Sequence, residues 1–236
     1  MQVGFPRLTS LVIIDLHKLT TIWHTQIAPD SFCKLIEFRV ESCSSLIHIL
    51  VPGILKRLHS LKKLHVKYCE SVEAVFNVEG TSGGDRDQSE MFIFRNLLEV
   101  IIWRCRSLKN VFPTSAARLL EKLELLWIST CEIMEQIIAE EEVGLPPKFM
   151  FPSVTILRLV WLPQLRCFYP GKHISMWPSL KQMGIFQCEK VEILADEYSS
   201  FQQQHEHETK RPFFLFEKVR LLVLFLNPIL LLNFQI

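Results

Sequence analysis

Hydrophobic and polar residues alternate along this chain in a pattern that returns at a nearly constant interval. Around Leu64, apolar residues lie three positions before it and two positions after it. A cysteine follows at five positions, and further apolar residues at eight, eleven and twelve. The same offsets recur, with few exceptions, around eight anchors in all: Leu11, Phe38, Leu64, Val100, Leu126, Leu157, Met183 and Leu222. This self-similarity predicts a repeat architecture.

The spacing of the anchors identifies the type of repeat. The steps between them are 27, 26, 36, 26, 31, 26 and 39 residues. A base step of 26 or 27 falls within the range of leucine-rich repeats, about 20–29 residues. The three longer steps carry polar inserts at 79–90, 140–148 and 196–211. We expect the inserts at 79–90 and 196–211 to be loops outside the core, and Glu140 to Glu142 to form a solvated loop edge.

The repeat predicts an α/β leucine-rich-repeat solenoid, a curved horseshoe of seven to eight coils. The anchor and the residue two positions later point to the same side of a short strand. Stacked coils bury these positions in one continuous core, and their parallel strands line the concave face. Helical segments of one or two turns at most are expected on the return limb at 52–58 and 113–120, which begin with proline. We expect a single array over 1–236, with regular coils over 5–195, a polar insert at 196–211 and a degenerate last coil at 212–236.

Composition narrows the class of protein. Hydrophobic residues make up 49% of the chain and charged residues 22%, which argues against disorder. The net charge of +1 argues against a nucleic-acid partner. Residues 1–10 show no secretory pattern, so we expect no secretory signal. The 16-residue apolar run 219–234 is short for a membrane span, so we expect no membrane span.

The cysteines and the His-Glu run are the residues that could form a metal or redox site, but a structural role explains them better. Five cysteines, here called the register cysteines, lie five residues after an anchor: Cys43, Cys69, Cys105, Cys131 and Cys188. They are never two to four residues apart, as zinc pairs are, so we interpret them as small buried residues whose thiols face a backbone turn. Reduced thiols indicate the cytoplasm, with the nucleus as a second possibility. The run His205-Glu206-His207-Glu208 lies in a glutamine-rich stretch and is interpreted as a solvated loop. We expect no metal, no cofactor, no small-molecule substrate and no enzymatic activity.

Residues between the buried strand positions are the candidates for partner binding, because they point out of the sheet. Those on the early coils are charged, whereas those on the later coils are aromatic or apolar. The candidate binding residues are Arg39, Lys63, His65, Lys67, Tyr68, Trp103, Trp127, Trp161 and Phe186. Clustered aromatic residues are typical of protein interfaces. Packing of the rings against their neighbours on adjacent strands is an equally good explanation.

Several runs resemble the C-terminal repeats of plant coiled-coil, nucleotide-binding, leucine-rich-repeat disease-resistance proteins. They are Ser31-Phe32-Cys33-Lys34-Leu35, Val40-Glu41-Ser42-Cys43, Leu64-His65-Val66-Lys67-Tyr68-Cys69-Glu70, Phe151-Pro152-Ser153 and Trp161-Leu162-Pro163-Gln164-Leu165. The resemblance covers the chain from Phe5 to about Val219.

The resemblance implies a regulatory recognition module of an intracellular immune receptor in plant defence. Its partner would be a pathogen effector, a guarded host protein or the receptor's own nucleotide-binding domain. The chain has no G-x-x-x-x-G-K-[ST] phosphate loop, so ATP binding does not carry over. We therefore expect a fragment of a receptor, a truncated product or a gene-model piece. The alternative is a repeat adaptor, such as the substrate-selecting module of a ubiquitin ligase.

Overall fold

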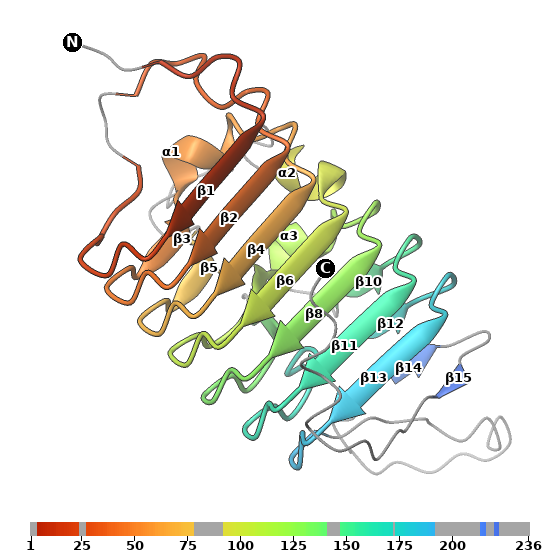
Figure 1. The fold of residues 1–236 in the computed structure, drawn as a ribbon. Helices are drawn as coiled ribbons and strands as arrows, with labels where there is room; N and C mark the ends of the chain where they lie inside the picture. Colours follow the sequence, from red (N-terminus) through yellow and green to blue (C-terminus); the bar gives the residue numbers. More distant parts are fainter. Residues whose placement is uncertain are drawn as a thin grey trace, which may run out of the picture.

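The computed structural model describes residues 4–23, 27–77, 92–140, 147–171, 173–191, 213–215 and 220–221. Its main feature is one parallel sheet whose strands follow each other in chain order across the molecule (Figure 1). The eight strands are β1 (Ser10–Ile14), β2 (Glu37–Glu41), β4 (Lys63–Lys67), β6 (Glu99–Trp103), β8 (Leu125–Ser129), β11 (Ile156–Val160), β13 (Gln182–Phe186) and β15 (Arg220–Leu221). This arrangement confirms the predicted solenoid. The first seven of these strands delimit about six turns, slightly fewer than the seven to eight coils predicted.

The strands pair in the register that the repeat predicts, with one exception. Phe38 lies opposite Leu64, and Leu64 lies opposite Val100. In the last pair, however, Met183 lies opposite Leu221, so the predicted anchor at Leu222 is wrong by one residue. The run from 219 to 226 is apolar at nearly every position, and alternation cannot fix the register of such a strand.

The return limb of the coils combines short helices with short strands. The helices α1 (Pro52–Leu55) and α3 (Thr114–Ala117) form within the predicted segments and have four residues each, about one turn, as predicted. A third short helix, α2, spans Phe92–Asn96. Short strands, which the sequence pattern did not predict, pair from coil to coil: β3 (His48–Leu50) with β5 (Ala74–Phe76), β7 (Phe112–Pro113) with β9 (Ile138–Ala139), and β12 (Ile174–Met176) with β10 (Lys148–Met150) and β14 (Phe213–Leu215). Strand pairing between stacked coils satisfies backbone groups that one helical turn would leave unpaired.

The polar inserts lie mostly outside the described residues. All of 79–90 and 196–211 lies outside them, and so does the loop prediction for these two inserts. Residues 141–146 of the second insert also lie outside them, and its last residue, Lys148, begins strand β10.

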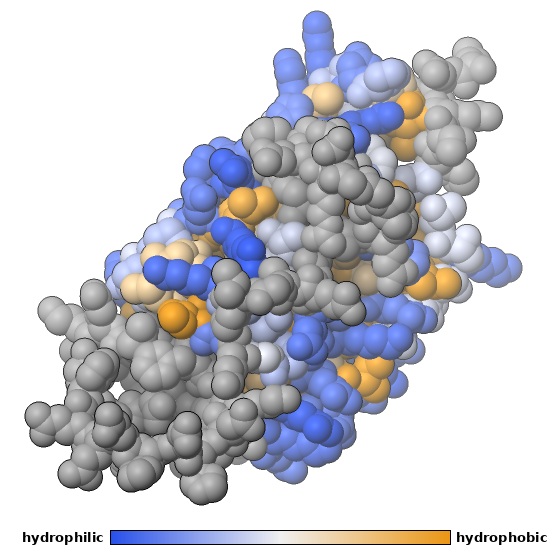
Figure 2. Space-filling model, turned by 180° about the vertical axis from the view of Figure 1, so that it is seen from behind, coloured by the Kyte–Doolittle hydropathy of each residue, from blue (hydrophilic) through white to orange (hydrophobic). Residues whose placement is uncertain are grey.

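The core runs between the main sheet and the return limb. The residues predicted to be buried in the third coil are all 0% exposed, which confirms the register: Leu61, Leu64, Val66, Cys69, Val72 and Val75. At the open edge, Leu11 and Ile13 of β1 are only partly buried, since β1 pairs on one side only. Figure 2 shows the molecule from behind, on the side away from the main sheet of Figure 1. In the described part of that side, hydrophobic residues form separate small patches among hydrophilic ones.

Each main-sheet strand from β1 to β13 ends in the same backbone reversal. The residue immediately after the strand has a positive φ, between 51° and 59°, and none of these residues is glycine: Asp15, Ser42, Tyr68, Arg104, Thr130, Trp161 and Gln187. That conformation costs an L-residue roughly 1–2 kcal/mol. In the first six cases the N–H of this residue donates to the last strand carbonyl of the next coil, at 2.7–3.1 Å. The reversal therefore extends the parallel ladder by one hydrogen bond per coil.

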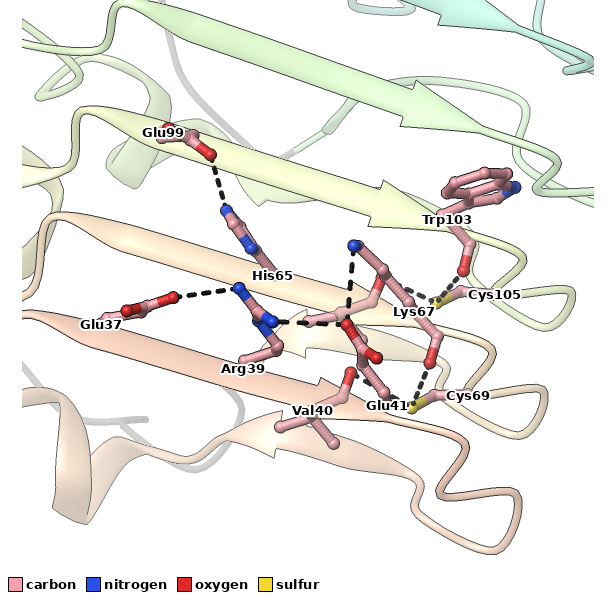
Figure 3. Close-up of polar contacts among 11 residues, drawn as sticks. Glu37, Arg39, Val40, Glu41, His65, Lys67, Cys69, Glu99, Trp103 and Cys105 are labelled. Atoms are coloured by element: carbon pink, nitrogen blue, oxygen red, sulfur yellow. Dashed lines mark hydrogen bonds and ion pairs between the residues drawn. The ribbon is translucent and has the colours of Figure 1, made fainter. Parts of the chain in front are cut away.

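The register cysteines follow this reversal directly. Each thiol donates to the carbonyl two residues before it, with sulfur–oxygen distances of 3.3–3.7 Å, in Cys43, Cys69, Cys105, Cys131 and Cys188. The Cys69 thiol also reaches the Val40 carbonyl of the preceding coil at 3.9 Å (Figure 3). This confirms the prediction of buried thiols that face the turn. Burial raises the pKa of Cys69 to about 11 and that of Cys131 to about 12.

Truncating an anchor residue should destabilise the solenoid strongly. Leu64 is fully buried, and Leu64→Ala removes apolar contacts and leaves a cavity. We expect a loss of about 2–5 kcal/mol in the free energy of unfolding, measured by denaturant titration. Lys62→Ala, at an exposed site two residues away, should change it by less than about 0.5 kcal/mol. Equal effects of the two substitutions would contradict the burial of the anchor.

The register thiols should resist alkylation in the folded chain. Only the thiolate reacts, and a pKa raised from 9.0 to about 11 lowers the thiolate fraction of Cys69 at pH 8 by about a hundredfold. Iodoacetamide labelling followed by mass spectrometry should modify the half-buried Cys33 first and leave Cys69 and Cys131 unmodified until denaturant is added. Labelling of Cys131 at the rate of Cys33 would show that the thiol is not buried.

Candidate interaction surface on the main sheet

The predicted binding residues lie on the side of the main sheet that faces away from the core, here called the sheet face. Seven of them project from strands, at the first, third or fifth strand position, and Tyr68 and Trp161 occupy the positive-φ position after β4 and β11. The structure divides the nine residues between a charged cluster on β2, β4 and β6 and an aromatic part that continues to β13.

The charged cluster consists of Glu37, Arg39, Glu41, Lys63, His65, Lys67 and Glu99. Strand register places Glu37 opposite Lys63, and Glu41 opposite Lys67. Opposite charges at such cross-strand positions attract each other. Figure 3 shows the Arg39 guanidinium between two carboxylates, 3.3 Å from Glu37 and 3.9 Å from Glu41. Lys67 Nζ lies 3.5 Å from the same Glu41 oxygen.

His65 lies within this cluster and is only 7% exposed. Its Nε2 is 2.7 Å from one oxygen of Glu99, whose other oxygen is 3.7 Å from Lys63 Nζ. Burial lowers the pKa of His65, and this effect outweighs the opposing influence of the Glu99 carboxylate. In the free chain, His65 therefore lies beneath the surface that a partner would meet.

The aromatic row consists of Tyr68, Trp103 and Trp127, which stack across β4, β6 and β8. The ring centroids of Tyr68 and Trp103 are 5.8 Å apart, and those of Trp103 and Trp127 are 6.2 Å apart, with interplanar angles of 28° and 21°. The rings thus pack against their neighbours on adjacent strands, which was one of the two explanations offered for them; the other was partner binding. Packing leaves part of the row accessible, however, since Tyr68 is 38% exposed.

Trp161 and Phe186 lie beyond the row. Trp161 is 45% exposed, and within the described part of the chain neither residue makes a ring contact with the row. The Phe186 ring lies over Gly184, where a Cβ atom would come within 2.8 Å of it. The glycine thus leaves room for this ring on the sheet face.

Three contributors to this surface were missed in the sequence. Glu99 holds His65, while Arg104 and Arg158 lie over rings of the aromatic row, with guanidinium carbons 5.6 Å from the Tyr68 centroid and 5.3 Å from the Trp127 centroid. Glu99 and Arg158 occupy outward strand positions, so alternation alone could have identified them. Arg104 occupies the same positive-φ position as Tyr68 and Trp161, but only the aromatic residues at that position were selected from the sequence.

The described residues contain neither a candidate metal-binding group nor a candidate membrane-spanning helix. They include no group of three His, Cys, Asp or Glu residues arranged to hold a metal ion. Among the same residues, no helix is long and apolar enough to cross a membrane.

The stacked coils and their continuous parallel sheet define a leucine-rich-repeat solenoid, a scaffold for protein interactions. The chain belongs to the family described as "Plant disease resistance protein RPS2-like, leucine-rich repeats". The family model matches residues 7–89 and 84–132, which together make up just over half of the 236 residues. Searches of curated proteins and of solved structures gave no significant match.

Removing the Glu99 carboxylate should lower the pKa of His65 further. The two contributions that raise this pKa both come from Glu99, so in Glu99→Gln the lowering effects of burial and of the Lys67 and Arg39 charges are unopposed. We expect the imidazole NMR resonances of His65 to titrate at lower pH than in the unmodified chain. The pKa of His65 in the folded chain lies below the ordinary value of 6.5. The neutral imidazole therefore adds to the free energy of unfolding above pH 6.5. This contribution is lost as the pH falls through the folded-state pKa.

Glu37→Gln is the matched control, since Glu37 bonds Arg39 and not the histidine. It should leave the His65 titration nearly unchanged. A pKa that rises in Glu99→Gln would contradict the assigned role of Glu99.

Proposed function

We propose that this chain is the protein-recognition and regulatory module of a plant intracellular immune receptor. It senses a pathogen effector or a guarded host protein in the defence response, or contacts the nucleotide-binding domain of a full-length receptor. Membership of the plant disease-resistance repeat family supports this role over that of a ubiquitin-ligase adaptor. The module acts by surface complementarity, without catalysis, cofactor or small-molecule substrate.

The observation that carries the proposal is the aromatic row on the sheet face. Tryptophan, tyrosine and arginine are the residues most enriched at the energetic centres of protein interfaces. Here Tyr68, Trp103 and Trp127 form one stacked, partly exposed row, and Arg104 and Arg158 lie against it. The opposite side of the molecule shows only scattered hydrophobic patches in its described part (Figure 2).

The proposed compartment is the cytoplasm, with the nucleus as a second site. None of the seven cysteines forms a disulfide in the structure, and five of them are buried in the repeat register. Reduced thiols are stable in these compartments, whereas oxidising compartments favour disulfides.

The proposal predicts that partner binding depends on the aromatic row. The test is a selection of displayed fragments from plant proteomes and secreted pathogen proteins against the full chain, followed by affinity measurements with purified binders. Truncating an interface hot spot costs about 2 kcal/mol or more, so Trp103→Ala combined with Trp127→Ala should weaken binding at least thirtyfold.

Ile174→Ala is the control, because Ile174 is 44% exposed and lies on β12, outside the main sheet. It should change affinity by less than twofold, and circular dichroism should show that all variants are folded. Binders that tolerate the double tryptophan variant but are lost with Ile174→Ala would place recognition on another surface and overturn the proposal.

A further inference from the structure

The two parts of the sheet face differ in how their charges are balanced. In the charged cluster, three carboxylates lie among three lysine or arginine side chains, and each carboxylate pairs with at least one of them. The outward strand positions from β8 to β13 hold one cation and no carboxylate: Leu125, Trp127, Ser129, Ile156, Arg158, Val160, Gln182, Gly184 and Phe186. The second part of the face is therefore positively charged and apolar.

Arg104 and Arg158 keep their hydrogen-bonding capacity available. Within the described part of the chain, neither guanidinium has an ion pair or a side-chain hydrogen bond, and each contacts the ring beside it. A guanidinium can lie against a ring and still present its N–H groups, in a fork that matches a carboxylate.

The dimensions of this surface suit a short segment of polypeptide. Strands in a sheet are about 4.8 Å apart, so the three strand steps from β6 to β13 cover about 14 Å. An extended chain crosses that distance in about four or five residues at roughly 3.3 Å per residue. Such a segment could reach from Arg104, past Trp127 and Arg158, to Phe186.

We infer that this part of the sheet face binds an acidic, apolar-rich peptide segment of the partner protein. Carboxylates of the segment pair with Arg104 and Arg158, and its apolar side chains pack on Trp103, Trp127 and Phe186. The inference rests on the proposed function and adds the chemistry of the partner. Charge complementarity selects an acidic segment, because a partner without carboxylates would leave two guanidinium groups desolvated and unpaired.

A single-stranded nucleic acid is the competing occupant, since bases stack on aromatic rings and phosphates attract arginine. Nucleic-acid binding normally needs a basic stripe that neutralises many phosphates. This face offers two uncompensated arginines, in a chain of net charge +1. The observations therefore favour the peptide.

The test uses the full chain and a synthetic twelve-residue peptide in which glutamates are interspersed with leucine and phenylalanine. The same peptide with glutamine at each glutamate is the matched probe, and a single-stranded twelve-nucleotide oligonucleotide is the competitor. Fluorescence anisotropy should show that the glutamate peptide binds at least tenfold more tightly than the glutamine peptide. Added salt should reduce that difference.

Charge-neutral variants identify the residues responsible. Arg104→Gln combined with Arg158→Gln should lower affinity for the glutamate peptide to that for the glutamine peptide and leave the latter unchanged. Arg166→Gln is the control, because Arg166 is exposed, lies outside the main sheet and is 4.0 Å from Glu135. It should leave both affinities unchanged.

The possible failures are distinguishable. Equal binding of the two peptides, lost in Trp127→Ala, overturns the acidic partner but leaves recognition by the sheet face intact. Tighter binding of the oligonucleotide than of either peptide overturns the peptide assignment. No binding of either peptide at about 1 mM also overturns the inference, whereas the proposed function is decided separately by the display selection.

Discussion

The hydrogen bond that joins each strand end to the next coil sets the geometry of the whole molecule. The backbone turns at a positive φ after each of the seven main-sheet strands from β1 to β13. In six coils the N–H at that point donates to the last carbonyl of the next main-sheet strand. Residues as different as Asp15, Tyr68 and Trp161 adopt this conformation. The inter-coil bond and the buried register residue that follows together compensate for the strain, so the side chain at the reversal is free to vary.

That freedom connects the scaffold to its surface. The residue at the reversal projects beside the sheet face, and the residue that follows it is buried as a cysteine in five coils. Tyr68 and Arg104 occupy successive reversals, which brings the guanidinium over the phenol ring. The same structural position therefore provides both the ladder that stacks the coils and part of the candidate recognition surface.

The sheet face combines two electrostatic solutions on one continuous sheet. Cross-strand pairing neutralises the charged cluster internally, and burial keeps the pKa of His65 low despite the neighbouring carboxylate. Further along the sheet, aromatic rings replace the carboxylates as neighbours of the arginines. Ion pairs already made within the chain have little to gain from a partner, whereas a guanidinium over a ring can still accept a carboxylate. Specificity is therefore expected from the aromatic part of the face.

The sequence by itself determined the repeat, the buried register and the direction of the side chains, because alternation and a fixed interval convert directly into faces of stacked strands. Leu64 and its equivalents could be placed without coordinates. Only the tertiary structure decided the short return strands, the burial of His65, the stacking of the aromatic row and the position of Arg104 over Tyr68. These features depend on contacts between residues 24 or more positions apart in the sequence. They form only when coils stack, so no local sequence pattern predicts them. The register of the last strand also depended on the structure, because an apolar run does not distinguish Leu221 from Leu222 as the anchor.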